Sequence, residues 1–281
     1  MSTPLRRRSL RARLLDLISD ATDRITAAWQ ILTNAQTRLL AALAAIRPGR
    51  AAPARIRAAA LLFQQALAAF DRAVAGFAER WAATDLPAAY RHGALATFDH
   101  VSRPHRSWTW TPRHQAAITS ITAQHYSDLM GRLTEALRRA RAFLRAALDA
   151  TRARIDRFTL PAFDRDALRR DHPLDTVVYA NDARHPVESW ARAALSWQAV
   201  TAANAGAIRT AADELRCDWM EVRDGPGCGW TGHGDSDVAD GSLRTVQDAL
   251  AHPVAHPHCR REFRPRPDVI SRPDYAFGGP F

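Results

Sequence analysis

Two short pairs of cysteine and histidine residues in the C-terminal quarter of the sequence have the residue types and spacing of metal ligands. Cys228 and His233 are separated by four residues in a glycine-rich stretch, and His256 and Cys259 are separated by two. A loop of 22 residues joins the two pairs. Structural zinc sites are commonly built from two such close pairs, and thiolate with imidazole suits Zn²⁺ better than Mg²⁺ or Ca²⁺. The sequence therefore predicts a zinc site at these four residues.

Other residues in the same stretch have side chains that could take the place of one of these ligands. They are Cys217, Asp224, Asp235, His252 and His258. A second interpretation needs no metal: the histidines are ordinary loop residues, the thiols are buried, and hydrogen bonds between His256 or Asp224 and backbone amides fix the turns. Asp224, Gly225 and Pro257 are then the residues expected to shape those turns.

The segment from 217 to 268 has few apolar residues from which to build a core. Glycine and proline are frequent there, as in Asp224-Gly225-Pro226-Gly227. A small module with little hydrophobic surface usually needs a covalent or metal cross-link. The chain has three cysteines, an odd number that gives no disulfide framework in a chain of this length. A metal is therefore the expected cross-link.

Signatures of catalysis are weaker than those of a structural metal site. The sequence has no Ser-His-Asp spacing, nucleophile elbow, phosphate loop or dinucleotide fingerprint. A metal-dependent nuclease or a toxin-type enzyme is conceivable from His233, Asp235, His256 and His258. Such a site needs an open coordination position and a general base, and no residue stands out as the base. We therefore expect a protein that is not an enzyme, with the metal nuclease as the alternative.

The first 81 residues carry two heptad patterns of apolar residues. From Leu10 to Ile46 one track holds large residues and the other mostly alanine, and from Ile56 to Trp81 one track is rich in phenylalanine. Such patterns predict long amphipathic helices of coiled-coil type. Arg47-Pro48-Gly49 ends the first helix, and the short connection predicts an antiparallel hairpin with alanine facing phenylalanine. The stripes are typical of a core, and the alternative is an exposed face that docks on a partner helix or shell.

Further helices and breaks follow along the chain. We expect helices over 85–98, 112–158 and 187–215, a break over 102–112 in which Trp108 and Trp110 lie on a short extended segment, and a connector with Pro161 and Pro173. The fold class is therefore mainly α: a long helical hairpin or bundle followed by a small α+β, loop-rich C-terminal module stapled by zinc. The domains are expected at 1–84 (hairpin), 85–215 (helical domain), 216–268 (Cys/His module) and 269–281 (tail).

The charge balance is strongly basic. The 281 residues include 39 basic and 29 acidic ones, a formal net charge of +10, and every basic residue is arginine. Arginine binds phosphate in a bidentate fork, so the balance favours contact with polyanions. GC-rich codon usage explains the same composition equally well. The candidate phosphate contacts are Arg138, Arg139, Arg141 and Arg145 on the long helix, and the alternative is a solvated helix face.

The apolar runs of the sequence give no support for a membrane-spanning segment. The longest, such as Leu39–Ile46, are too short to span a bilayer. The basic residues near Arg13 are followed by Asp16 and Asp20, so the pattern of a secretory signal is missing. We therefore expect a protein that is neither a membrane protein nor secreted.

The segment from 217 to 268 resembles the C-terminal module of the phage Mu F-like minor head proteins of tailed bacteriophages, especially the actinophage versions. The resemblance lies in Trp219–Gly225 leading into Cys228-Gly229-Trp230-Thr231, and in the closing Ala255–Arg261 with its His-Pro-x-Cys-Arg signature. The stretches Gln198–Asn204 and Asp85–Gly93 also fit. Many members have Cys-x-x-Cys at the first pair and end in Cys-Arg-Cys, where this chain has His233 and Arg261.

The resemblance implies a minor capsid protein that acts in head morphogenesis. Such a protein would be assembled in the host cytoplasm, reside in the virion in multiple copies, and associate with the portal protein and the major capsid protein. Contact with packaged double-stranded DNA is also implied, and the arginine excess and the long helical seams agree with these expectations.

Overall fold

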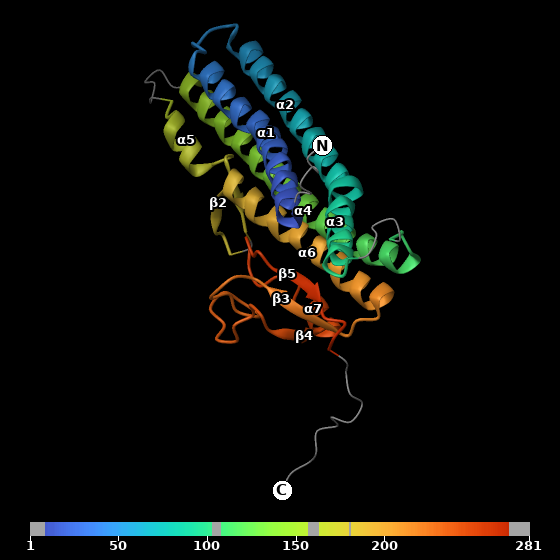
Figure 1. Cartoon of the computed structure of the whole chain (residues 1–281). Helices are drawn as coiled ribbons and strands as arrows, with labels where there is room; N and C mark the ends of the chain where they lie inside the picture. Colours follow the sequence, from blue (N-terminus) through green and yellow to red (C-terminus); the bar gives the residue numbers. More distant parts are fainter. Residues whose placement is uncertain (1–8, 103–107, 157–162, 180, 270–281) are drawn as a thin grey trace, which may run out of the picture. The chain divides into compact units, whose positions relative to one another are not determined.

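The computed structural model describes residues 9–102, 108–156, 163–179 and 181–269. Within them the chain is mainly helical, with two small antiparallel sheets in its C-terminal half (Figure 1). The expected fold class, a helical hairpin followed by a small mixed module, is confirmed. Pro161 and the expected tail from residue 270 onward lie outside the described residues.

Long helices make up the first part of the chain, and all the strands of the described residues lie in its C-terminal half. The helices are α1 (Leu10–Ala44), α2 (Ala52–Arg80), the π-helix η1 (Trp81–Asp85), α3 (Leu86–His100), α4 (Pro112–Asp156), α5 (Arg165–Asp171), α6 (Val187–Leu215) and α7 (Val246–Ala251). The strands are β1 (Thr176–Val178), β2 (Arg184–Pro186), β3 (Trp219–Arg223), β4 (Leu243–Thr245) and β5 (Glu262–Pro265). Among the described residues, none of the helices combines the length and the apolar character needed to cross a membrane.

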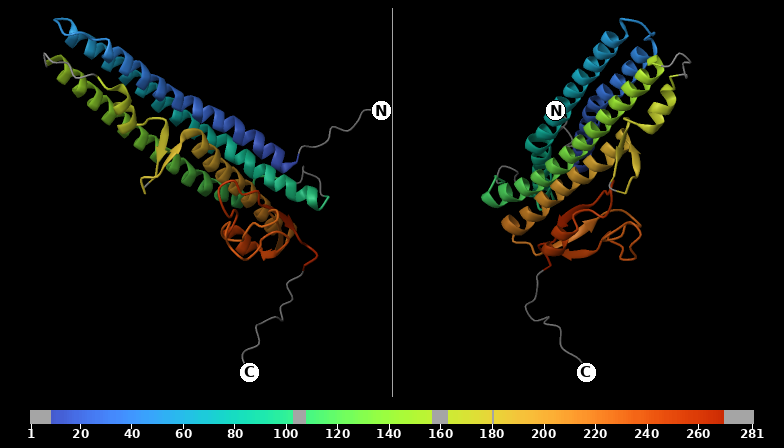
Figure 2. Two further views of the ribbon diagram at one scale, coloured as in Figure 1. Left: turned by 90° about the vertical axis from the view of Figure 1, so that its left-hand side faces the viewer. Right: turned by 180° about the vertical axis from the view of Figure 1, so that it is seen from behind.

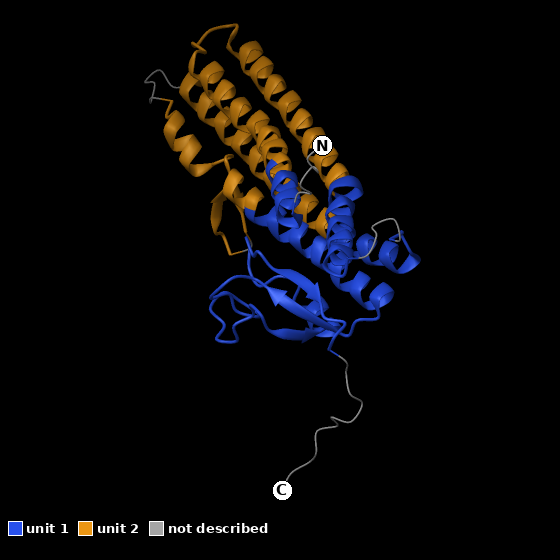
Figure 3. Ribbon diagram, in the orientation of Figure 1, with its two compact units in different colours: residues 1–19, 82–124, 193–281 blue, residues 20–81, 125–192 orange. Residues whose placement is uncertain are grey.

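The chain divides into two compact units (Figure 3). One comprises residues 20–81 and 125–192, and the other comprises residues 1–19, 82–124 and 193–281. The helices α1, α4 and α6 each contribute residues to both units. We call the first the hairpin unit and the second the C-terminal unit, and describe each by itself.

In the hairpin unit, α1 and α2 run antiparallel and side by side, with α4 alongside them (Figure 2). The large heptad residues are buried as predicted, including Ile25, Leu32 and Leu39. The expected pairing of alanine with phenylalanine is only part of the packing. Phe70 meets the Trp29 ring edge-on, with centroids 5.0 Å apart, and Phe63 packs on Phe143 of α4 at 5.6 Å. Trp29 belongs to neither heptad track, so the aromatic contacts were not visible in the pattern.

Three arginines of α4 donate hydrogen bonds to backbone carbonyls elsewhere in this unit. Arg154 donates to the carbonyls of Leu43, Ala44 and Ile46 and so satisfies the C-terminal end of α1. Arg139 donates to Pro173 O and Thr176 O, and Arg132 donates to Val178 O. The expected connector around Pro173 thus contains α5, β1 and β2, which these bonds attach to the long helix.

The helix expected to begin at Asp85 is continuous with the helix before it. Trp81–Asp85 forms a π-helical turn that joins α2 directly to α3, and the Asp85 side chain makes no capping hydrogen bond. Pro87 lacks the N–H that an α-helical ladder needs at this point, so a wider turn relieves the defect. Trp108 and Trp110 lie on a segment that is neither helix nor strand. The Trp108 indole donates to Thr210 of α6.

Within the C-terminal unit, α3 and α6 cross at two glycines. A Cβ on Gly93 would lie 1.8 Å from Ala203 O, and one on Gly206 would lie 2.1 Å from Tyr90 O. Only glycine allows the two backbones to approach so closely. The Tyr90 hydroxyl is hydrogen-bonded to His114 Nδ1 at 2.8 Å, and burial raises the pKa of Tyr90 far above its usual range.

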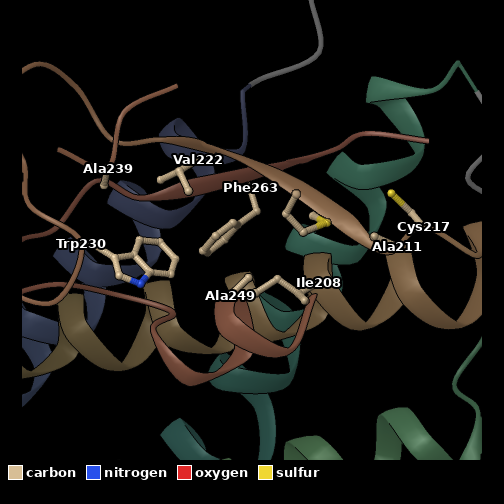
Figure 4. Packing of buried hydrophobic residues seen from close by; sticks show 9 residues of the cluster. Ile208, Ala211, Cys217, Val222, Trp230, Ala239, Ala249 and Phe263 are labelled. Atoms are coloured by element: carbon tan, nitrogen blue, oxygen red, sulfur yellow. The ribbon is translucent and has the colours of Figure 1, made fainter. Parts of the chain in front are cut away.

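The second sheet has the order β4-β3-β5, with both pairs antiparallel. It packs on α6 through a hydrophobic cluster (Figure 4). The cluster comprises Ile208, Ala211, Cys217, Met220, Val222, Trp230, Ala239, Ala249 and Phe263. The prediction that this segment has too little apolar material for a core is therefore wrong. The core forms because α6 supplies Ile208 and Ala211 from outside the segment, and because Met220, Trp230 and Phe263 of the segment are buried. Val238 and Leu243 are exposed.

Candidate metal centre

Cys228 lies on a loop that is fixed from both sides by backbone hydrogen bonds. Its N–H donates to Gly225 O, and its carbonyl accepts from Ala239 N at 2.9 Å. Gly225 has a φ of +104°, a conformation that favours glycine, so the expected turn residue does shape this turn. The Asp240 carboxylate accepts from the N–H groups of Asp224 and Gly225, and these bonds lower the pKa of Asp240.

His256 and Cys259 lie on one tight turn after α7. The Cys259 N–H donates to His256 O at 3.0 Å, and His258 between them has a φ of +67°. The His256 Nδ1–H donates to Pro257 O at 2.7 Å. A carbonyl only accepts, so this bond places the proton on Nδ1 and leaves Nε2 of the neutral ring free to bind a metal ion.

The two turns bring three of the four predicted ligands together. Cys228 Sγ, His256 Nε2 and Cys259 Sγ all lie within 4.8 Å of one another, and Cys228 Sγ is 3.5 Å from His256 Nε2. Both thiols are buried, and the imidazole is half-buried. Ligands about 2.0–2.3 Å from one ion in tetrahedral geometry are about 3.3–3.8 Å apart, so small adjustments would let these atoms hold one ion. The residues present therefore fit a metal ion with a soft, thiolate-rich ligand set.

Asp224 stands directly behind the cluster and connects it to a buried arginine. Cys259 Sγ donates to Asp224 Oδ1 at 3.3 Å, while Asp224 Oδ2 accepts from Nη2 and Nε of Arg261 at 2.7 and 3.0 Å. Both charged side chains are fully buried. Burial of the thiol, together with the adjacent Asp224 carboxylate, raises the pKa of Cys228 to about 12. The thiol is therefore protonated at neutral pH until a metal displaces the proton.

Arg261 is the site residue that sequence reasoning missed. Its remaining N–H groups donate to Trp230 O, His252 O and Gly229 O at 2.9–3.0 Å, so all five donors are used. Register explains its position: Arg223 of β3 pairs with Glu262 of β5, so the next residues outward along the two strands are Asp224 and Arg261. The sequence gives no sign of that register, and the resemblance marked position 261 only as a missing cysteine.

Asn204 ties the same region to α6. Its side-chain amide donates to Pro253 O at 2.7 Å and to Arg261 O at 2.9 Å. The segment that carries His256, Cys259 and Arg261 is thereby attached to a long helix of the same unit. The site is positioned by a polar network as much as by the hydrophobic cluster.

The fourth predicted ligand, His233, lies beside the cluster but outside it. Its ring is exposed and meets the His256 ring edge-on, with centroids 4.8 Å apart. The alternative ligands have other partners. Cys217 is buried in the hydrophobic cluster and donates to Trp219 O, and Asp235 accepts from Thr231 and Asp237 within its own turn. His252 pairs with Asp248. His258 is exposed on the turn between His256 and Cys259.

The candidate phosphate contacts on α4 differ in their surroundings. Arg138 is exposed and forms an ion pair with Glu135 at 2.8 Å, whereas Arg139 is committed to backbone carbonyls as described above. Arg141 and Arg145 are exposed. The stripe expected from the sequence is thus only partly a free cationic surface.

Among the described residues, Cys228, His256 and Cys259 are the only group of three or more His, Cys, Asp or Glu side chains close enough to hold a metal. No family model matches the chain, and the searches of curated proteins and of solved structures likewise found no similar protein. The chemistry of this cluster therefore carries the functional argument.

Proposed function

We propose that this chain is a minor capsid protein of a tailed bacteriophage, with a C-terminal module closed by zinc. The observation that carries the proposal is the Cys228–His256–Cys259 cluster, because it lies in the segment that resembles the phage Mu F-like module. In this proposal the helices associate with the portal and major capsid proteins in the virion, and the module is a rigid docking element.

Zinc would be held by the two thiolates and by His256 Nε2, and its chemistry there is to cross-link two turns that are otherwise joined by hydrogen bonds and by the buried Asp224–Arg261 ion pair. His233 is the nearest side chain that can supply a fourth ligand, because it is exposed and its ring already abuts His256. Asp224 and Arg261 support the site from behind by orienting the Cys259 thiol.

A metal-dependent hydrolase is the second candidate, and one observation favours it. Three clustered protein ligands with an open fourth position is the pattern of catalytic zinc. The engagement of the nearest carboxylates supports the structural role instead. Asp224 is bound to Arg261, and Asp235 caps its own turn, so neither is free to act as a general base.

Metal analysis of the purified full-length chain tests the zinc site. We expect about one zinc per chain, lost in Cys228→Ser and in Cys259→Ser and retained in Cys217→Ser, whose sulfur lies in the hydrophobic cluster. A chain that takes up no zinc, or that loses it equally in all three variants, would contradict the site. Incubation with DNA and RNA in the presence of Zn²⁺, Mn²⁺ or Mg²⁺ should give no cleavage, and cleavage abolished by His256→Ala would establish the enzyme instead.

The place in the virion needs a separate test. The chain should copurify with heads and with portal rings of the phage that encodes it, in several copies per particle. Its absence from both would sink the capsid assignment while leaving the zinc site untouched.

A further inference from the structure

The hairpin contains a long stretch without acidic residues. Residues 24–70 include six arginines and no aspartate, glutamate or lysine. Five of these arginines lie within 20 residues around the connection between α1 and α2: Arg38, Arg47, Arg50, Arg55 and Arg57. All five are exposed, and none has an ion-pair partner among the described residues.

Several exposed arginines elsewhere in the described chain are paired with a carboxylate. Arg113 pairs with Asp213, Arg192 with Glu188, and Arg223 with Glu221, at 2.8–3.2 Å. Other exposed arginines, such as Arg141, Arg145 and Arg260, also have no ion pair among the described residues. What distinguishes the hairpin end is that five arginines lie within 20 residues that contain no acidic residue. Codon usage explains why the basic residues are arginine, but it does not explain why one stretch lacks acidic residues.

The connection that carries Arg47 and Arg50 is held in place. Arg154 binds three carbonyls at its α1 end, and Ala52 N–H donates to Gly49 O at its α2 end. Two acidic residues of α4 lie near Arg154 in sequence, Asp149, which pairs with Arg152, and Asp156. The N-terminal turn of α2 contains no acidic residue, so the positive end of its dipole is uncompensated there. It offsets the negative end of α1, whose last carbonyls are already bound by Arg154.

We infer that this hairpin end, residues 38–57, binds the phosphate backbone of double-stranded DNA without sequence preference. Arginine forks fit phosphate oxygens, and an ordered connection presents them with little further loss of conformational freedom. From Ala44 to Arg57 the remaining side chains are alanine, isoleucine, proline and glycine, which cannot read base edges by hydrogen bonding. The inference goes beyond the proposed function, because it requires neither zinc nor a portal.

Fluorescence anisotropy of the full-length chain with a labelled 30-base-pair duplex, between 50 and 200 mM NaCl, tests the surface. Five phosphate contacts give a slope of log affinity against log salt of about −4.5, a loss of about 500-fold over this range. The variant with Arg47, Arg50, Arg55 and Arg57 all changed to Gln should retain a slope of about −0.9. Circular dichroism should show unchanged helix content, since glutamine is a good helix former and all four sites are exposed.

A charge-matched control changes Arg113, Arg192, Arg223 and Arg260 to Gln, and we expect it to keep the steep slope. Equal loss in both variants would reduce the effect to net charge and overturn the inference. A wild-type chain that fails to bind DNA at 50 mM salt would also overturn the inference. The same holds if binding is abolished only in the double variant Arg141→Gln, Arg145→Gln. Competition by polyglutamate as strong as by DNA of equal charge would overturn the phosphate assignment.

Discussion

The helical hairpin and the C-terminal module achieve order in different ways. The hairpin buries periodic leucine, isoleucine and aromatic side chains, such as Leu32 and Phe70 at 0% exposure. The module also has a hydrophobic cluster, but at its centre lies a buried polar network around Arg261 and Asp224, next to two thiols and an imidazole. Apolar packing tolerates small changes in shape, whereas a buried charge network fails when one member is removed. The two regions should therefore respond differently to substitution.

Arg261→Met should give the largest difference between the two regions. The change leaves the Asp224 carboxylate buried without its cation and leaves the carbonyls of Gly229, Trp230 and His252 without these donors. Removing one partner of a buried ion pair costs about 3–5 kcal/mol. Hydrogen exchange should show loss of protection in 217–269 with α2 still protected, while Arg260→Met, at the exposed neighbour, should leave both unchanged. Equal protection in the two variants would mean that the network contributes little.

Gly93→Ala should come next, because it tests the crossing of α3 with α6, the helix on which the module packs. The new Cβ would lie 1.8 Å from Ala203 O, so α3 and α6 must separate, and overpacking of this kind costs about 3 kcal/mol. Urea denaturation measures the loss. Gly131→Ala on α4 is the matched control: no atom lies within 4 Å of its added Cβ, so the higher helix propensity of alanine should raise stability by up to about 1 kcal/mol. A Gly93→Ala variant as stable as wild type would show that the crossing is looser than described.

The same contrast explains how much could be predicted from the sequence. The apolar period located α1, α2, α4 and α6 to within a few residues, since burial of one helix face leaves a direct trace in residue type. Cys228, His256 and Cys259 were found because thiols and imidazoles are rare and their spacing is local. Arg261 and Asn204 were not found as site residues, because their roles depend on strand register and on carbonyls distant in sequence. The role of Gly93 could not be predicted either, because a close helix crossing leaves no periodic pattern in the sequence.

Zinc should stabilise the module and leave the hairpin unaffected. At a free zinc concentration 100 times the dissociation constant, binding adds about 2.7 kcal/mol to the stability of the folded form. Chelation should therefore lower the melting temperature of wild type and of Cys217→Ser, and should have no effect on Cys259→Ser, which has already lost a ligand. Chelator-insensitive melting of the wild type would mean that Arg261 and Asp224 order the module without a metal.

His125→Leu should have the smallest effect and should change the acid sensitivity of the hairpin unit. The His125 ring is buried, and neither of its nitrogens has a hydrogen-bond partner among the described residues. Burial lowers its pKa, against the opposing charge of Asp128, so the folded chain holds the ring neutral. Below the unfolded pKa of about 6.5 the unfolded chain binds the extra proton, and stability therefore falls as the pH falls.

The leucine variant should gain about 1 kcal/mol at pH 7 by removing an unsatisfied polar group, and its stability should fall less than that of wild type between pH 7 and pH 5. A His125→Leu profile parallel to that of wild type would exclude the buried imidazole as a source of acid sensitivity.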